Sequence, residues 1–231
     1  MPDPHAYIAA KFDVSLAGAK PSTPIELPNV GRDPGLTRML AYLGCTSGAE
    51  IGVERGLFSE ALLRENPALH LTCVDAWKAY RGYRDHVDGA KLQSFYIETQ
   101  ERLAQFHTRV TIVRQFSLDA ARDVSDGSLD FVYLDANHNI ENVIADLAAW
   151  TPKVRAGGII AGHDYVRYRL PNQIHVLQGI NAWVDSWEIA PWFLLGRHAK
   201  VDGEVRDTAR SWFWVHGPKP VHRKGRKPVK Q

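Results

Sequence analysis

Apolar runs of strand length alternate with amphipathic helical segments along most of this chain. The runs contain many β-branched and aromatic residues and lie at 49–53, 70–75, 110–113, 129–135 and 158–161. Strands that alternate with helices at this spacing form βαβ units, which build a parallel sheet covered by helices on both faces. The pattern therefore predicts an α/β fold, a Rossmann-like sandwich of three layers.

The last third of the chain departs from this alternation. After a predicted helix over 174–187, two aromatic strands at 191–196 and 211–216 are separated by a charged, glycine-containing stretch. Two strands joined in this way pair most simply as an antiparallel hairpin. We therefore expect a mostly parallel, seven-stranded sheet that ends in a C-terminal antiparallel hairpin.

The ends of the chain differ in composition from its middle. Residues 1–34 are rich in proline and lack periodicity, so we expect an extended arm or loop cap. Residues 35–216 hold all the predicted strands and form the predicted folded domain. Residues 217–231 are rich in Lys, Arg and Pro and are expected to be a disordered tail.

The net charge of +2 combines a mildly acidic body with this basic tail. The tail carries six of the 28 lysines and arginines and no acid, so the other 216 residues have 22 basic against 26 acidic residues, a net charge of −4. Such a body argues against a surface shaped for nucleic acid, except through weak contacts of the tail. A small-molecule partner is the better expectation, and the N-terminal arm could reach a neighbouring subunit in a homo-oligomer.

Targeting and redox signals are few. No apolar run is long enough to cross a bilayer, and the first residues lack the basic and apolar regions of a secretory signal. Cys45 and Cys73 lie in or beside apolar runs, where buried free thiols are expected rather than a disulfide. These observations predict a cytoplasmic protein.

A glycine turn follows the first predicted strand of the sheet, in the stretch Glu50-Ile-Gly-Val-Glu-Arg-Gly56. Gly52 permits a sharp turn and close approach of a ligand, and Asp75 ends the next strand, where a carboxylate can accept hydrogen bonds from a ribose. A nicotinamide dinucleotide site usually has another glycine in the middle of this loop. Here Glu50 and Glu54 flank the turn, and their charge suits a cationic ligand such as S-adenosylmethionine (SAM) better than a pyrophosphate.

Four motifs in order resemble class I SAM-dependent methyltransferases, most closely the O-methyltransferase group that includes catechol-type and macrocin-type enzymes. The resemblance covers roughly residues 35–216 and rests on these segments: Glu50–Gly56, Cys73-Val-Asp75-Ala-Trp77, Asp126-Gly-Ser-Leu-Asp-Phe-Val-Tyr-Leu-Asp-Ala-Asn-His138 and Gly157-Gly-Ile-Ile-Ala-Gly-His-Asp-Tyr165. The terminal hairpin also matches that fold. The resemblance implies transfer of a methyl group from SAM, with a hydroxyl of a small molecule or sugar as the acceptor.

The resemblance also assigns roles to the cofactor residues. It implies that Gly52 and Gly56, with Glu50 beside them, line the methionine portion of SAM and that Asp75 holds the ribose. Ser117, in the turn after the third strand, is implied to contact the adenine. Glu54 stands where the family has its central loop glycine.

A second set of polar residues follows the fourth and fifth strands. Asp135 ends one strand and His163-Asp164 ends the next, while His138 begins the helix after Asp135. The carboxyl ends of parallel neighbours share one edge of a sheet, so these side chains should meet there. In metal-dependent members of the family, residues at the positions of Asp135, His163 and Asp164 hold the ion. Oxygen ligands favour Mg²⁺, and a histidine shifts the preference toward Mn²⁺.

The sequence leaves several alternatives open. Without a metal, His138 or His163 could act as the general base beside Asp135. Asp135 could instead cap a helix, and Asp164 could pair with a nearby arginine.

Three aromatic residues in the loop after the second strand, Trp77, Tyr80 and Tyr83, could wall a substrate pocket or cover the core. Two other functions compete with SAM-dependent methyl transfer: a nicotinamide-dependent oxidoreductase on a Rossmann fold, and a SAM-binding or scaffold module without catalysis.

Overall fold

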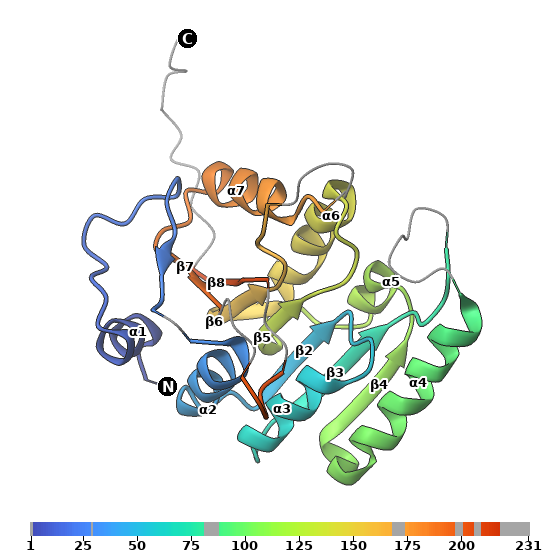
Figure 1. The fold of residues 1–231 in the computed structure, drawn as a ribbon. Coiled ribbons are helices and arrows are strands. Elements are labelled where there is room, and N and C mark those ends of the chain that lie inside the picture. Colours follow the sequence, from blue (N-terminus) through green and yellow to red (C-terminus); the bar gives the residue numbers. More distant parts are fainter. Residues whose placement is uncertain are drawn as a thin grey trace.

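A single twisted sheet forms the middle layer of the protein (Figure 1). The computed structural model describes residues 2–28, 30–80, 88–167, 174–196, 201–205 and 209–217. Within these residues the strands are β1 (Ile25–Glu26), β2 (Ser47–Ile51), β3 (His70–Asp75), β4 (Val110–Arg114), β5 (Leu129–Leu134), β6 (Val154–Gly162), β7 (Trp192–Leu195) and β8 (Ser211–Val215). Their order is β1-β7-β8-β6-β5-β2-β3-β4. Strand β8 is antiparallel to β6 and β7, and the remaining pairs are parallel.

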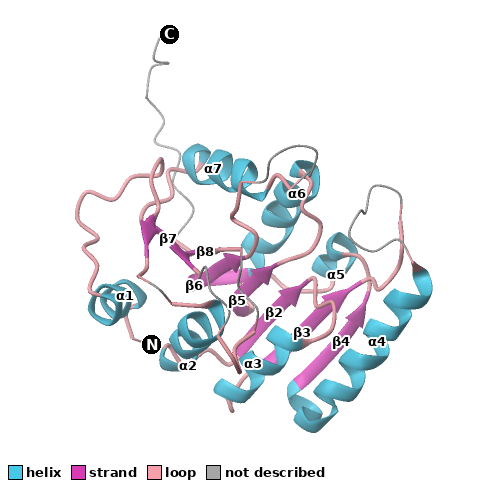
Figure 2. Ribbon diagram, viewed as in Figure 1, coloured by secondary structure: helices cyan, strands magenta, loops and turns pink. Residues whose placement is uncertain are grey.

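Helices cover both faces of this sheet (Figure 2). They are α1 (Pro4–Phe12), α2 (Arg38–Tyr42), α3 (Leu57–Glu65), α4 (Gly89–Leu103), α5 (Ser117–Arg122), α6 (Ile140–Trp150) and α7 (Val176–Ser186), with short helical turns η1 (Asp33–Thr37), η2 (Ala104–Arg109) and η3 (Thr151–Lys153). Helices α1 to α4 share one buried cluster, and α5 to α7 share the other. The three-layer α/β fold, the mainly parallel sheet and the C-terminal hairpin are thereby confirmed.

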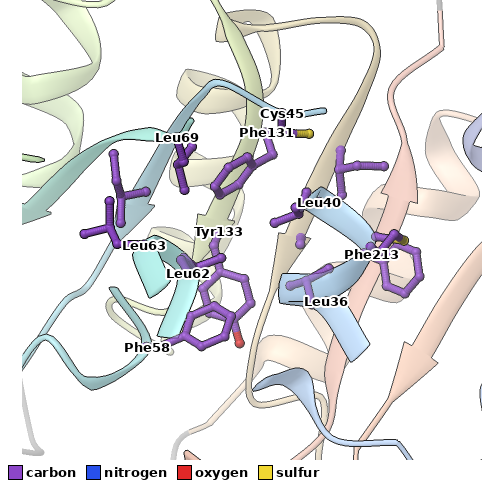
Figure 3. Packing of buried hydrophobic residues seen from close by; sticks show 14 of the residues in the cluster. Leu36, Leu40, Cys45, Phe58, Leu62, Leu63, Leu69, Phe131, Tyr133 and Phe213 are labelled. Carbon is purple, nitrogen blue, oxygen red and sulfur yellow. The ribbon is translucent and has the colours of Figure 1, made fainter. Parts of the chain in front are cut away.

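Each face of the sheet has its own hydrophobic core. On the α3 side, Phe58 and Leu62 pack with Phe131 and Tyr133 of β5, beside Leu36 of η1 (Figure 3). Alternation along β5 sends its other side chains to the opposite core, where α6 and α7 contribute large apolar residues. All six residues of β5 are buried, so this strand lies at the centre of the molecule.

Strand β2 lies where the order of the strands reverses. Its neighbours are β3 on one side and β5 on the other, so the chain leaves β2 and β5 in opposite directions across the sheet. In open α/β sheets, ligands bind beyond the carboxyl ends of the strands at this point. The ends of β2, β3, β5 and β6 therefore define the edge of the sheet that carries the candidate site.

The segment before residue 35 differs from the expected extended arm, and the sheet has eight strands rather than seven. Asp3 caps α1 by accepting the His5 N–H at 2.9 Å, and Pro4 supplies a first helical residue with a preset φ. Strand β1 adds two residues to the edge of the sheet by pairing parallel with β7. So short a strand has no periodicity that sequence analysis could detect.

Other expectations have mixed outcomes. Cys45 and Cys73 are buried free thiols, as predicted. Among the described residues, no helix combines the length and the apolar character needed to cross a bilayer. The basic tail from residue 218 onward and Tyr83 lie outside the described residues, and the boundaries of the catalytic domain stay predictions.

Gly162, the last residue of β6, offers a test of the packing at this edge. A Cβ there would lie 2.3 Å from Trp212 Cζ2 and 2.4 Å from the Leu134 carbonyl oxygen. We expect Gly162→Ala to lower the free energy of unfolding by about 1–3 kcal/mol or more, because backbone and an indole must both move. Urea denaturation measures this. Gly89→Ala, with no neighbour within 4 Å, should change stability little, and equal stability of both variants would contradict the packing described here.

Candidate functional site

Gly52 forms the turn at which β2 leaves the sheet. Its φ is +89°, and a Cβ on it would lie 2.1 Å from the carbonyl oxygen of Asp135. The Asp135 N–H in turn donates to the Ile51 carbonyl at 2.7 Å. The turns after β2 and β5 are thus pressed against each other, and only glycine fits at position 52.

The rest of the glycine loop is held from two neighbouring elements. Glu54 has a left-handed backbone, with φ at 52°, in place of the family's glycine. Its carbonyl accepts hydrogen bonds from Trp77 Nε1 at 2.7 Å and Thr99 Oγ1 at 3.1 Å. Gly56, with φ at 72°, leads directly into α3. These contacts fix the path of the loop despite the strain at Glu54.

Asp75, at the end of β3, fixes the same loop through its carboxylate. One oxygen accepts the N–H groups of Val53 at 3.1 Å and Glu54 at 3.0 Å, and the other accepts the Trp77 N–H at 2.8 Å. Burial raises the pKa of Asp75, although these three donors favour its ionised form. In the structure Asp75 organises the loop, and its contact with a ribose stays a prediction.

Glu50 lies below the turn, on β2, and is 2% exposed. Ser59 of α3 donates a short hydrogen bond to its carboxyl group. Burial raises the pKa of Glu50 to about 8, while Ser59 and Arg32 act in the opposite direction. Near neutral pH, with no bound cation beside it, this carboxyl group therefore carries a proton rather than the charge that the sequence suggested.

The predicted polar cluster forms at the ends of β5 and β6. His138 Nε2 lies 2.9 Å from Asp164 Oδ2 and 3.6 Å from Asp135 Oδ1. His163 Nδ1 lies 3.5 Å from Asp164 Oδ1 and 3.8 Å from Asp135 Oδ2, and the His163 carbonyl accepts from Trp212 Nε1. Burial alone would raise the pKa of Asp135, but His163, His138 and a nearby arginine together hold that pKa well below its usual range.

The donor atoms of this cluster fit a divalent metal. One ligand atom from each of Asp135, His138 and Asp164 lies within 4.8 Å of the other two. Among the described residues, this is the group of three His, Cys, Asp or Glu side chains whose ligand atoms come so close together. The predicted metal set contained His163 in place of His138. A mixed nitrogen and oxygen donor set suits Mn²⁺ or another transition metal better than Mg²⁺. Asp135, His138 and Asp164 would therefore be the ligands of such an ion.

The sequence analysis missed Arg32, which enters the site from the segment before η1. Its side chain is almost fully buried, and Nη1 donates to Asp135 Oδ2 at 3.1 Å. More than a hundred residues separate the two along the chain. A single arginine in a proline-rich segment gave no signal of this contact.

Ser117 begins α5, where the sequence placed an adenine contact. Its hydroxyl donates a short hydrogen bond to Asp146 and accepts one from Trp150 Nε1 at 2.9 Å. Asp146, which the sequence analysis also missed, therefore fixes the Ser117 hydroxyl. Burial raises the pKa of Asp146 to about 6. An open cavity of about 540 Å³ adjoins this turn and is lined by Ala76, Lys78, Arg114, Gln115, Phe116, Asp119, Arg122 and Asp123.

The two described loop aromatics have different surroundings. Trp77 is 2% exposed and belongs to the core cluster on the α3 side, which fits the core-covering alternative. Tyr80 lies edge-on to the ring of Phe116, and its hydroxyl accepts from Asn137 Nδ2 at 2.8 Å. Tyr80 therefore spans the space between the turn before α5 and the loop after β5.

We expect Asp75→Asn to lower the free energy of unfolding by about 1.5–3 kcal/mol, because charge-assisted hydrogen bonds to three backbone N–H groups are lost or weakened. Urea denaturation at pH 7 provides the measurement. Asp185→Asn, on an exposed position of α7, is the matched control. Equal effects of the two substitutions would show that Asp75 does not hold the loop.

Glu50 should make stability depend on pH in a defined direction. Between its ordinary pKa of 4.5 and its raised pKa of about 8, the folded chain keeps a proton that the unfolded chain has lost. Stability therefore falls as pH rises through this window, by up to about 1.4 kcal/mol per pH unit. Glu50→Gln should remove this part of the slope in urea denaturation from pH 5 to 8. The exposed Glu101→Gln should not, and parallel slopes for wild type and Glu50→Gln would contradict the assignment.

Comparisons with known proteins place the chain in a family. A methyltransferase domain family matches residues 49–165. An uncharacterized protein of Sinorhizobium fredii is 24% identical over 117 residues, which are 51% of this chain but only 12% of that protein. The chain thus corresponds to a small part of that relative's length.

Solved structures share the fold. An O-methyltransferase from Bacillus cereus in complex with SAH is 17% identical, with 80% of each chain covered and a TM-score of 0.57. A proposed caffeoyl-CoA O-methyltransferase from Staphylococcus aureus is 15% identical, with 94% of this chain and 93% of that chain covered and a TM-score of 0.58. Because the family match spans just over half of the residues, the resemblance is confirmed: the chain belongs to the methyltransferase domain family.

Proposed function

We propose that this methyltransferase transfers the methyl group of SAM to a hydroxyl of a small molecule or sugar. The observation that carries the proposal is the contact between Gly52 and Asp135. It places the turn expected to hold the methionine portion of SAM directly against the polar cluster of Asp135, His138 and Asp164. Methyl transfer is an in-line displacement, so donor and acceptor must be held this close together.

The charges around the turn support a cationic cofactor. Glu54 lies in the loop, and the Asp75 carboxylate borders it. A sulfonium and an ammonium group are attracted to carboxylates, whereas a pyrophosphate is repelled. This feature, together with the antiparallel β8, favours SAM over a nicotinamide dinucleotide.

The polar cluster can prepare the acceptor hydroxyl for attack. We assign His138 as the group that takes the hydroxyl proton, because the imidazolium that forms lies between Asp135 and Asp164, which balance its charge. His163, beside the same carboxylates, is the alternative base. That role of His138 applies to the metal-free site. A divalent metal bound to Asp135, His138 and Asp164 would occupy the His138 nitrogen and would supply a Lewis acid that lowers the pKa of the hydroxyl, with His163 left as the base.

Calorimetric titration with SAM is the first test of the proposal. We expect binding in the micromolar range and weaker binding by Asp75→Ala, because the loop that Asp75 organises would loosen. Absence of binding at high micromolar SAM would exclude the proposal.

Turnover needs a panel of catechol, phenol and sugar acceptors with methyl-labelled SAM, assayed with EDTA and with added Mn²⁺. We expect His138→Ala to lower the rate about 10²- to 10⁴-fold with little change in SAM affinity. His70→Ala, on an exposed position at the opposite end of β3, should leave the rate unchanged. SAM binding with no turnover of any acceptor would favour a non-catalytic module.

A further inference from the structure

Arg32 reaches the candidate site from outside the segment that the methyltransferase family matches. The match begins at residue 49, whereas Arg32 precedes η1. Its Nη1 donates both to Asp135 Oδ2 at 3.1 Å and to the Tyr133 hydroxyl at 3.0 Å. A residue of the N-terminal segment therefore contacts the carboxylate on which the polar cluster is built.

The guanidinium group is fixed by its surroundings. Its central carbon lies 4.9 Å from the centre of the Phe58 ring and 5.8 Å from that of Tyr133, two rings that lie side by side in Figure 3. The Tyr133 hydroxyl is also 3.0 Å from Ser211 Oγ of β8. Aromatic faces and hydrogen bonds from three elements thus hold this cation in one place.

The backbone that carries Arg32 is equally well anchored. Leu36 of η1 and Met39 and Leu40 of α2 are each about 1% exposed. Asn66 Nδ2 donates to the Thr37 carbonyl at 3.2 Å, and Asp33 accepts the Val205 N–H at 3.2 Å. Packing of the neighbouring residues in the core therefore fixes the backbone from which the Arg32 side chain extends.

A fixed cation at this place affects any metal at the site. Arginine keeps its charge at all relevant pH values, and here it engages Oδ2 of Asp135 while Oδ1 faces His138. A divalent ion on Asp135, His138 and Asp164 would share Asp135 with the guanidinium, at a distance where like charges repel strongly in a buried site. The ligand atoms suit a metal, but the arginine opposes its charge.

We propose that Arg32 is a positioning residue that serves as the resident cation of the site: it orients Asp135 and keeps the affinity for divalent metal low. The inference builds on the proposed function in taking this cluster as the acceptor site. It implies that the fixed charge on the N-terminal segment supplies part of the charge compensation that a tightly bound metal would otherwise provide.

Mn²⁺ binding to the full, metal-free chain tests this without any acceptor. The free Mn²⁺ signal in electron paramagnetic resonance is followed during titration of wild type, Arg32→Gln and Arg32→Lys. We expect Arg32→Gln to bind Mn²⁺ about tenfold more tightly or better, since one unit of opposing charge is removed near the ion. Arg32→Lys should stay close to wild type, because an ammonium group keeps the charge that opposes the metal.

Two further variants make the result specific. Arg38→Gln removes a charge from the neighbouring helix α2, where the side chain is 63% exposed, and should leave Mn²⁺ affinity unchanged. Asp135→Asn combined with Arg32→Gln should abolish the gain, because the metal loses the ligand that Arg32 contacts.

The proposal is overturned if a folded Arg32→Gln binds Mn²⁺ no more tightly than wild type, or if neither binds it. Where circular dichroism shows that Arg32→Gln does not fold, Arg32→Met, which also removes the charge, decides: a folded Arg32→Met that binds Mn²⁺ no more tightly than wild type overturns the proposal. SAM titrations on the same samples separate the two ideas. Intact SAM binding with no effect of Arg32 removes only this inference, whereas failure of wild type to bind SAM removes the proposed function.

Discussion

The contact between the backbone turns after β2 and β5 sets the geometry of the whole site. A side chain at position 52 would overlap the Asp135 carbonyl, so the two turns approach as closely as peptide groups allow. The separation between the glycine loop and the backbone that carries Asp135 is thus fixed and does not depend on side-chain rotamers. Methyl transfer depends on such a fixed separation, because small displacements of reacting groups cost large factors in rate.

Three carboxyl groups surround this contact, one buried (Glu50) and two half-buried (Asp75 and Asp135), and each meets the cost of desolvation in a different way. Glu50 keeps its proton and accepts a hydrogen bond from Ser59. Asp75 binds three backbone N–H groups. Asp135 is surrounded by Arg32 and two imidazoles. Burial without such partners would cost several kcal/mol for each charge. These partners therefore allow three carboxyl groups to lie near the expected cofactor without a large loss of stability.

Sequence periodicity predicted the elements that packing alone determines. The strand Leu129–Leu134 is buried on both faces, so its composition is constrained along the whole run. The first helix, Pro4–Phe12, had a usable signal in Asp3-Pro4, which was missed because prolines were interpreted as a loop. Two-residue β1 had none, since its pairing with β7 uses backbone groups only.

The candidate site also contains residues that the sequence could predict and residues that it could not. The residues at strand ends were predictable because parallel strands bring their carboxyl ends to one edge, and Asp135, His163 and Asp164 do meet there. The donor set contains His138 rather than His163 because it depends on where each imidazole nitrogen lies in the folded chain. Spacing along the chain carries no such information.

Arg32 is the extreme case, because its place depends on the entire assembled core. The guanidinium needs the rings of Phe58 and Tyr133, the hydroxyl of Tyr133 and the carboxylate of Asp135, which come from α3, β5 and the loop after it. The N-terminal segment must pack through η1 and α2 before these groups enclose it. Folding of a segment outside the matched domain and the charge state of the candidate site are therefore coupled, since a chain that lacked this segment would leave Asp135 without one of the cations that lower its pKa.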